Sequence, residues 1–223
     1  MEVKLLAYSL PTLLVAEQLD SWDTEDQLAD ELSEYAGRIC YKSKRGANPA
    51  TATNEGYLAN IIKQEHFSVL EHASATFLVE GVSRHLLGEL TRHRHLSFSV
   101  ESLRYCPPTS STIHPTIHEH DLVDVLARAW AQADQNYKDI YDALVEKGLP
   151  KKQAREAAAQ VLPLSTSTDL VVTGNFRAWR DVIGKRLDPA ANREIRQLAD
   201  IILNELKDLA PNSFQDFEDG VWA

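Results

Sequence analysis

Positively charged side chains are concentrated at residues 92–95, in a chain that is otherwise acidic. These residues read Arg-His-Arg-His, whereas the 223-residue chain carries a formal net charge of -10. Two unit charges about 4 Å apart repel each other by roughly 1 kcal/mol in water and by about 4 kcal/mol at an effective dielectric constant of 20. Because the guanidinium fork suits phosphate and carboxylate groups, the cluster predicts a small anionic ligand. A solvated helix face with local salt bridges is the alternative interpretation.

The residues on either side of this cluster predict how it is held. Before it, Leu86, Leu87 and Leu90 have the spacing of a buried helix stripe, which would anchor the helix end. After it, apolar residues alternate imperfectly with hydroxyl-bearing ones, namely Leu96, Phe98, Val100 and Leu103 with Ser97, Ser99, Ser102 and Tyr105. This pattern indicates an extended, half-buried segment that leaves the helix with its polar groups facing a pocket.

Length and composition narrow the class of protein. One domain, residues 1–223, is the natural expectation for a chain of this length. A hydrophobic content of 43% and a charged content of 25% are typical of soluble globular proteins. The acidic balance argues against a nucleic-acid binder, which needs an extended basic face. A local basic site in an acidic protein suits a small phosphorylated ligand better.

The number of cysteines and the N-terminal residues indicate the cellular compartment. The chain has two cysteines, Cys40 and Cys106, which is too few for a disulfide framework and fits a reducing environment. Residues 1–6 lack the pattern of a cleavable signal, and no run approaches the roughly 18 apolar residues of a membrane span. We therefore expect a cytoplasmic protein with no membrane partner.

Hydrophobic periodicity predicts an α+β fold with about six helices and four or so strands. The predicted strands include 3–8, 73–80 and 165–174, and the predicted helices include 28–39, 54–62, 120–147, 151–161, 175–186 and 188–206. Three helix starts are predicted from capping residues: Thr24 with Gln27, Asn54, and Asp188 followed by Pro189. The long helix 120–147 has a broad apolar face that could pack in the core or against a second subunit.

Two segments carry a resemblance to a known family. Arg-His-Arg at residues 92–94 is followed after seven residues by Ser102, and then by Arg104-Tyr105. This spacing resembles the signature of the flavin-dependent thymidylate synthases. The segment 66–72, His-Phe-Ser-Val-Leu-Glu-His, is similar to a second segment of that family. The resemblance extends over most of the chain.

The resemblance implies a fold and an activity. The implied fold is an antiparallel sheet flanked by helices, which assembles as a homotetramer with active sites where subunits meet. The implied reaction is reductive methylation of dUMP to dTMP, with 5,10-methylenetetrahydrofolate as carbon donor and NADPH-reduced FAD as hydride donor. This reaction uses no protein nucleophile. A catalytically weakened homologue that still binds FAD and nucleotide is the alternative.

The resemblance also implies a role for individual residues. Arg186 would be catalytic, because a fixed cation beside the pyrimidine favours loss of the N3 proton and makes C5 more nucleophilic. Without the resemblance, a favourable helix dipole would explain an arginine there. The implied flavin contacts are His66, Ser68, Arg92, His93, Arg94, Val100, Asn175, Phe176, Arg177 and Asp181. The implied dUMP contacts are Glu89, Arg92, Glu101, Ser102, Leu103, Arg104, Arg155 and Arg186.

Three positions depart from the family pattern. Val100 stands where Glu or Gln is usual, and Asp181 stands where some members have Asn or His. An arginine is expected at Ala159, and Arg155 lies one helical turn earlier on the same face. These departures bear on activity and nucleotide affinity, although not on the fold.

Two other chemistries remain open. Cys106 could attack C6 of the pyrimidine, but its thiol would need a lowered pKa, and the prolines at 107–108 make a helix N-terminus beside it improbable. A metal could be bound by His93 with His95, or by residues 118–120, but a third and fourth ligand are not evident. We expect no metal.

Overall fold

The computed structural model describes residues 1–12, 14, 15, 19 and 28–218. Its centre is an antiparallel sheet with the strand order β1-β2-β4-β3. The strands are β1 (Glu2–Tyr8), β2 (Ser74–Ser83), β3 (Ser97–Val100) and β4 (Ser167–Asn175). The antiparallel sheet confirms the α+β prediction.

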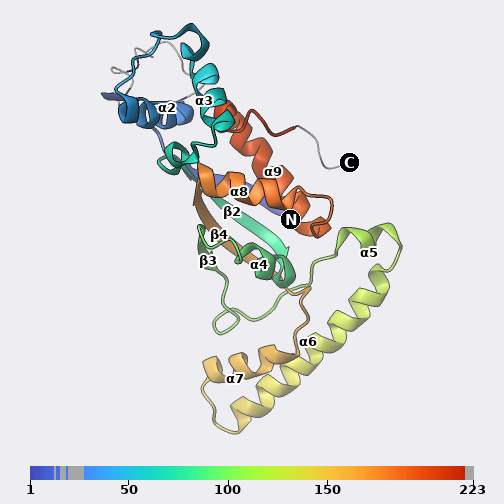
Figure 1. Cartoon of the computed structure of the whole chain (residues 1–223). Helices are drawn as coiled ribbons and strands as arrows, with labels where there is room; N and C mark the ends of the chain where they lie inside the picture. The colour runs from blue at the N-terminus through green and yellow to red at the C-terminus, as the bar shows by residue number, and fades with distance from the viewer. Residues whose placement is uncertain (13, 16–18, 20–27, 219–223) are drawn as a thin grey trace.

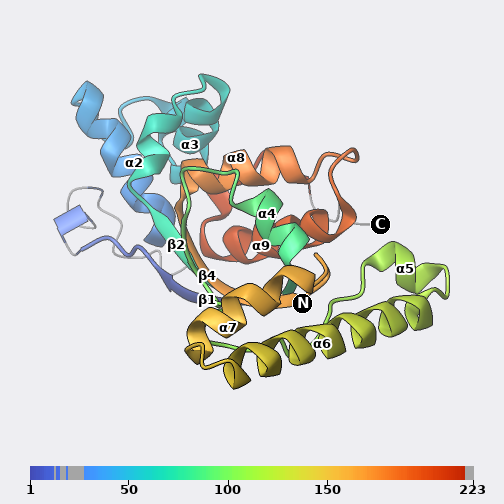
Figure 2. The same cartoon turned by 90° about the horizontal axis from the view of Figure 1, so that it is seen from below.

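Helices surround this sheet unevenly (Figures 1 and 2). The helices α8 and α9 lie along the sheet, α2 and α3 lie beyond one end of it, and the α6–α7 pair projects beyond the other end. The α-helices are α2 (Leu28–Tyr41), α3 (Asn54–Lys63), α4 (Arg84–Leu90), α5 (Pro115–Glu119), α6 (Val123–Glu146), α7 (Lys151–Ala158), α8 (Phe176–Arg186) and α9 (Arg193–Leu209). Short 3-10 turns include η2 (Phe67–Glu71), η3 (Ala159–Val161) and η4 (Pro211–Ser213).

The core is formed by residues of the sheet and of helices α3, α4, α8 and α9. Trp179 is fully buried, and its ring meets the ring of Phe77 on β2 edge to face, with centroids 5.3 Å apart. Its indole Nε1–H donates to the carbonyl oxygen of Ala75 at 3.1 Å, so that burial leaves no unpaired donor. This contact fixes the position of α8 along β2.

Gly174 on β4 permits a close approach that also positions the cationic segment. A Cβ atom at this position would overlap the side chain of Leu96 and crowd the ring of Trp179. Leu96 is buried and follows directly after residues 92–95. The absence of a side chain on Gly174 therefore allows the cationic segment to pack down onto the sheet.

The predicted helix 120–147 is wrong at its N-terminal end. Helix α5 ends at Glu119 and α6 begins at Val123, because Asp121 has a positive φ of 55° that a continuous helix does not accommodate. Aspartate tolerates this left-handed conformation better than most residues. In α6 the side chain of Tyr137 is buried. In the neighbouring helix α7, Ala154 and Ala158 are fully buried. The rest of the apolar face is half-buried or exposed in one chain.

Two predicted helix caps are also wrong. Thr53, and not Asn54, caps α3, and its hydroxyl accepts the Gly56 N–H at 3.1 Å. Asn192, and not Asp188, caps α9, and its side chain accepts the Glu194 N–H at 2.9 Å. The predicted cap at Thr24 lies outside the described residues. No helix of the described part is long and apolar enough to cross a membrane.

Buried carboxylates tie α2 to the C-terminal region. Asp30 accepts the backbone N–H groups of Asn212 and Ser213 at 2.8 and 2.9 Å, and it also contacts the Ser213 hydroxyl. Burial raises the pKa of Asp30 to about 6, although these hydrogen bonds oppose the shift. Glu34 accepts from Arg38 at 2.6 Å and from Asn54 at 2.8 Å. This second bond shows why Asn54 does not serve as a cap.

Candidate active site

The cationic residues lie in a tight turn between α4 and β3. Ser83 caps α4, and its hydroxyl accepts the Leu86 N–H at 2.9 Å. Leu86 and Leu90 are buried, as their spacing predicts. The turn closes with the His93 N–H donating to the Leu90 carbonyl at 3.1 Å. The chain then continues as β3, which confirms the predicted extended segment over Ser97–Val100. From Ser102 on the prediction is wrong, because the Tyr105 N–H donates to the Ser102 carbonyl at 2.9 Å and closes a turn.

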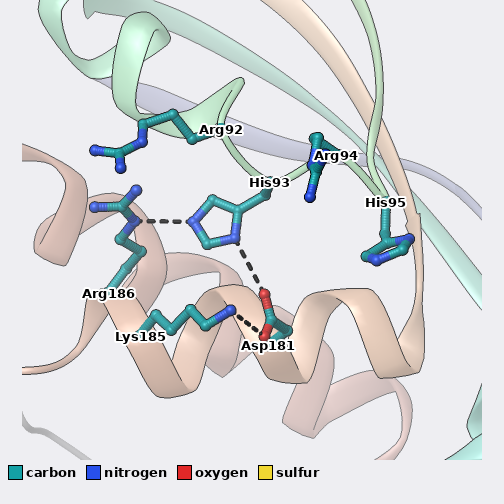
Figure 3. Close-up of a pocket in the computed structure, with 7 residues that line it drawn as sticks. All are labelled: Arg92, His93, Arg94, His95, Asp181, Lys185 and Arg186. Atoms are coloured by element: carbon teal, nitrogen blue, oxygen red, sulfur yellow. Dashed lines mark hydrogen bonds and ion pairs between the residues drawn. The ribbon is translucent and has the colours of Figure 1, made fainter.

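A cavity of about 420 Å³ lies between this turn and the last two turns of α8 (Figure 3). Its lining residues are Arg92, His93, Arg94, His95, Asp181, Lys185 and Arg186. Four of these side chains carry a permanent positive charge, and one is a carboxylate. The structure thus brings together the predicted flavin contacts of the turn, the predicted contact Asp181 and the predicted catalytic residue.

Arg186 is held in place by two neighbours. Its Nε–H donates to Nε2 of His93 at 2.9 Å, and its two terminal nitrogens donate to Glu89, at 3.0 Å to the carbonyl oxygen and at 3.4 Å to Oε2. A guanidinium group has five N–H donors. Three are therefore used, and two have no partner among the described residues. An arginine that is fixed in this way and has two free N–H donors can bind an anionic or carbonyl-bearing ligand.

His93 is the link between Arg186 and the acidic residue of the site. Its Nδ1 lies 3.3 Å from Oδ2 of Asp181, and Lys185 Nζ lies 2.6 Å from the other carboxylate oxygen of Asp181. Figure 3 shows these contacts as one continuous chain from Lys185 to Arg186. Because Nε2 accepts from Arg186, the proton of neutral His93 is on Nδ1, where it is donated to Asp181.

The charges of these groups follow from their surroundings. Burial of the His93 ring lowers its pKa, the positive charges of Arg186 and Lys185 lower it further, and the hydrogen bond to Asp181 opposes this only in part. Burial tends to raise the pKa of Asp181, but hydrogen bonds from Lys185 and His93 outweigh it and leave that pKa below its usual range. His93 is therefore neutral and Asp181 is ionised at neutral pH.

Two further cavities extend from this one toward α3. One of about 380 Å³ contains Ser68, His66 and Arg177 of the predicted flavin contacts. The other, also about 380 Å³, is lined by Asn175, Arg177, His95 and Asp181, so it shares residues with both neighbours. Arg177 Nη1 pairs with Glu71 at 2.5 Å at this junction. The three cavities are therefore neighbours, linked by the lining residues that they share.

Three predicted flavin contacts have other structural roles. The side chain of Asn175 caps α8 by accepting the Ala178 N–H at 2.8 Å. Phe176 is fully buried, with its ring centroid 5.4 Å from that of Phe214, so neither its ring nor its backbone is open to a ligand in this structure. Val100 pairs with Leu170 at the end of β3 and packs against the core. Its apolar side chain offers no polar contact.

The remaining predicted dUMP contacts lie elsewhere in the chain. Residues 101–104 and Arg155 are not among the residues that line the Arg186 cavity. Arg104 Nε pairs with Glu156 of α7 at 2.9 Å, and Tyr105 accepts from Lys152 at 2.6 Å. Arg155 lies over the ring of Tyr141, 5.9 Å from its centroid. One chain therefore holds the predicted dUMP contacts in two separate groups, with Glu89, Arg92 and Arg186 in the first.

The alternative chemistries gain no support from the geometry. Among the described residues, no group of three or more His, Cys, Asp or Glu side chains is placed to hold a metal ion. Cys106 is a free, half-buried cysteine whose N–H bonds to the Ser102 carbonyl at 2.9 Å, and it does not line the Arg186 cavity.

The sequence interpretation missed two charged residues of the site. Lys185 was not predicted, although its position four residues after Asp181 places both side chains on one helix face. Glu71 was recognised only as part of the 66–72 segment, and its pairing with Arg177 had no sequence signal because 106 positions separate them. Helix spacing would have found the first but not the second.

Comparisons with known proteins give matches over most of the chain. The family described as "Thymidylate synthase complementing protein" matches residues 23–212. The chain is 52% identical over 199 residues to a "Probable flavin-dependent thymidylate synthase" of Mycobacterium phage L5, covering 86% of this chain and 82% of that protein. It is 45% identical over 207 residues to a "Flavin-dependent thymidylate synthase" of Mycobacterium tuberculosis, covering 88% and 83%.

Proposed function

This chain belongs to the family of flavin-dependent thymidylate synthases, and we propose that its cationic turn and α8 form the site where dUMP is methylated to dTMP. The co-substrates in this proposal are 5,10-methylenetetrahydrofolate, the carbon donor, and NADPH, which reduces the bound FAD. The proposal rests on the position of Arg186. Hydrogen bonds to His93 and Glu89 hold its guanidinium group, and two of its N–H donors stay free for a ligand in a cationic cavity.

The charges of the site fit a flavin dinucleotide. Arg92 and Arg94 line the cavity, and neither guanidinium group has a hydrogen-bond or ion-pair partner within the described part of the chain. Two unpaired guanidinium groups suit a diphosphate, because each can donate two parallel hydrogen bonds to phosphate oxygens. The neighbouring cavities with Ser68 and Asn175 give a ligand of this length polar contacts along its remaining parts.

Arg186 is the residue proposed to activate the nucleotide. The flavin held by the residues of the turn would supply the hydride when bound and reduced. The two open N–H groups of Arg186 stabilise negative charge on the pyrimidine when its N3 proton is lost, and the added electron density makes C5 more nucleophilic. Because the guanidinium is already held by His93 and Glu89, little reorganisation is needed when the charge develops. No step requires a protein nucleophile.

A homotetramer with shared active sites is part of the proposal. Within one chain α6 buries only Tyr137 among its residues, so most of its apolar face is available to another subunit. The separation of Arg104 and Arg155 from the Arg186 cavity is also consistent with sites completed by a second copy. The two free cysteines fit the reducing cytoplasm.

The test is an assay for dTMP formation with purified protein, FAD, NADPH, methylenetetrahydrofolate and dUMP. We expect product only when all four are present, and no product from Arg186→Ala even though this variant still binds FAD. An Arg186→Ala variant that stays folded and active would refute the proposed role of Arg186. A wild-type protein that makes no dTMP under these conditions would refute the activity.

A further inference from the structure

The contacts of His93 define which proton state of its ring can hold Arg186. Nε2 of His93 accepts the Arg186 Nε–H at 2.9 Å, which requires a lone pair on that nitrogen. A doubly protonated imidazole has two N–H donors and no acceptor. Protonation of His93 would therefore break this bond and place two cations against each other. The Nε2–H tautomer of the neutral ring would break it equally.

Asp181 selects the tautomer that this bond requires. Its Oδ2 lies 3.3 Å from Nδ1 of His93 and is an acceptor only, so Nδ1 must carry the proton. Lys185 contacts the other oxygen, Oδ1, at 2.6 Å, which keeps the carboxylate oriented and ionised. Both oxygens of Asp181 are therefore engaged by protein groups. Asp181 is thus engaged by His93 and Lys185, whereas the resemblance implied that it contacts the flavin directly.

We propose that Asp181 and His93 are positioning residues for Arg186: Asp181 fixes the Nδ1–H tautomer of His93, and His93 in turn orients the guanidinium. This inference rests on the proposed function, because it concerns the arginine assigned to activate dUMP. The inference also explains why an acidic residue stands at position 181. Asparagine could accept from Nδ1 as well, but only a carboxylate adds a negative charge beside the ring.

The charged groups around His93 set the direction of the pH effect. Helix α8 contributes Asp181, Lys185 and Arg186, while the turn contributes Arg92, Arg94 and His95. Glu89 on α4 faces Arg186. The cations disfavour a charged imidazole, and Asp181 is the group that favours it. Removing the charge of Asp181 therefore extends the neutral state of His93 to lower pH.

Two substitutions at one position separate charge from hydrogen bonding. Asp181→Asn retains an acceptor for Nδ1–H, so we expect the tautomer to persist while the acidic limb of the kcat profile moves down by about one pH unit. Asp181→Ala removes the acceptor, so we expect the Nε2–H tautomer to become populated and kcat to fall about tenfold. Asp134→Asn is the matched control, because Asp134 also pairs with a lysine four residues later, at 2.6 Å on α6.

The decisive readout is nitrogen NMR of histidine-labelled protein without substrates, with the His93 signals assigned through His93→Gln. The proposal predicts a neutral Nδ1–H tautomer in the wild type and in Asp181→Asn, and its loss in Asp181→Ala. An Nε2–H tautomer in the wild type would overturn it. So would equal pH profiles and equal kcat for the Asn and Ala variants. The NMR measurement needs no turnover. A failure of this proposal can therefore be distinguished from a failure of the proposed dTMP-forming reaction.

Discussion

Replacing Arg186 by Lys preserves the charge at the end of α8 but removes the planar fork. An ammonium group has three donors, compared with the five of a guanidinium. In the structure, three donors of Arg186 are engaged by His93 and Glu89, which leaves two for a ligand. A lysine that reproduced the protein contacts would have no donor left. A lysine that turned toward the ligand would lose the contacts that orient it.

The expected cost follows from the two donors that are lost. A hydrogen bond to a charged group contributes about 1.5–3 kcal/mol, so two of them correspond to roughly 3–6 kcal/mol. If both form only as charge develops on the pyrimidine, kcat should fall by about 10²- to 10⁴-fold. FAD binding should change little, because Arg92 and Arg94 retain their charges. Flavin affinity and dTMP formation must therefore be measured on the same preparation.

The control for this experiment is Arg128→Lys, because Arg128 lies on an exposed part of α6 away from the cavity. We expect it to behave like the wild type in both measurements. An Arg186→Lys variant with kcat within about threefold of the wild type would refute the argument that the two additional N–H donors of arginine are needed for catalysis. Parallel loss of flavin binding and activity would refute the assignment of Arg186 to the nucleotide.

Three further perturbations test other parts of the structure. Arg104→Gln should weaken dUMP binding by about 10- to 100-fold in calorimetry and leave FAD binding nearly unchanged, since a charged hydrogen bond is lost; equal weakening of both ligands would argue against a phosphate contact. Gly174→Ala should destabilise the fold by about 1–3 kcal/mol and weaken FAD binding, because the new Cβ displaces Leu96; an unchanged melting temperature would contradict this. Asp30 has a folded-state pKa of about 6 against 3.8, so the folded state retains its proton to higher pH, and the free energy of unfolding falls by about 2 kcal/mol as pH rises from 4 to 6. Urea unfolding should show this slope in the wild type and a flatter one in Asp30→Asn.

Elements with local sequence signals were predicted well. The apolar spacing of Leu86 and Leu90 placed the helix before the cationic turn, and the alternation after it indicated β3. The resemblance assigned Arg186 and His93 to the same active site, and the structure places both in the lining of one cavity. These features depend on neighbouring residues or on a spaced signature.

Features that depend on tertiary partners were not predictable. Asn54 was a reasonable cap, but its side chain bonds to Glu34 and to Asn212, which are distant in sequence. The helix break at Asp121 depends on a backbone conformation that several residue types tolerate. The bond between His93 and Arg186 joins residues 93 positions apart, and no spacing rule predicts which ring nitrogen accepts.

The central claim is that the guanidinium groups of Arg92 and Arg94 hold the phosphates of a flavin, and titration of the protein with FAD tests it most directly. Visible absorbance should show saturable binding to the wild type, and Arg92→Gln combined with Arg94→Gln should raise Kd by about 100-fold or more, because two charged contacts are removed. Equal affinity of wild type and double variant, or no binding of FAD to the wild type, would contradict the account.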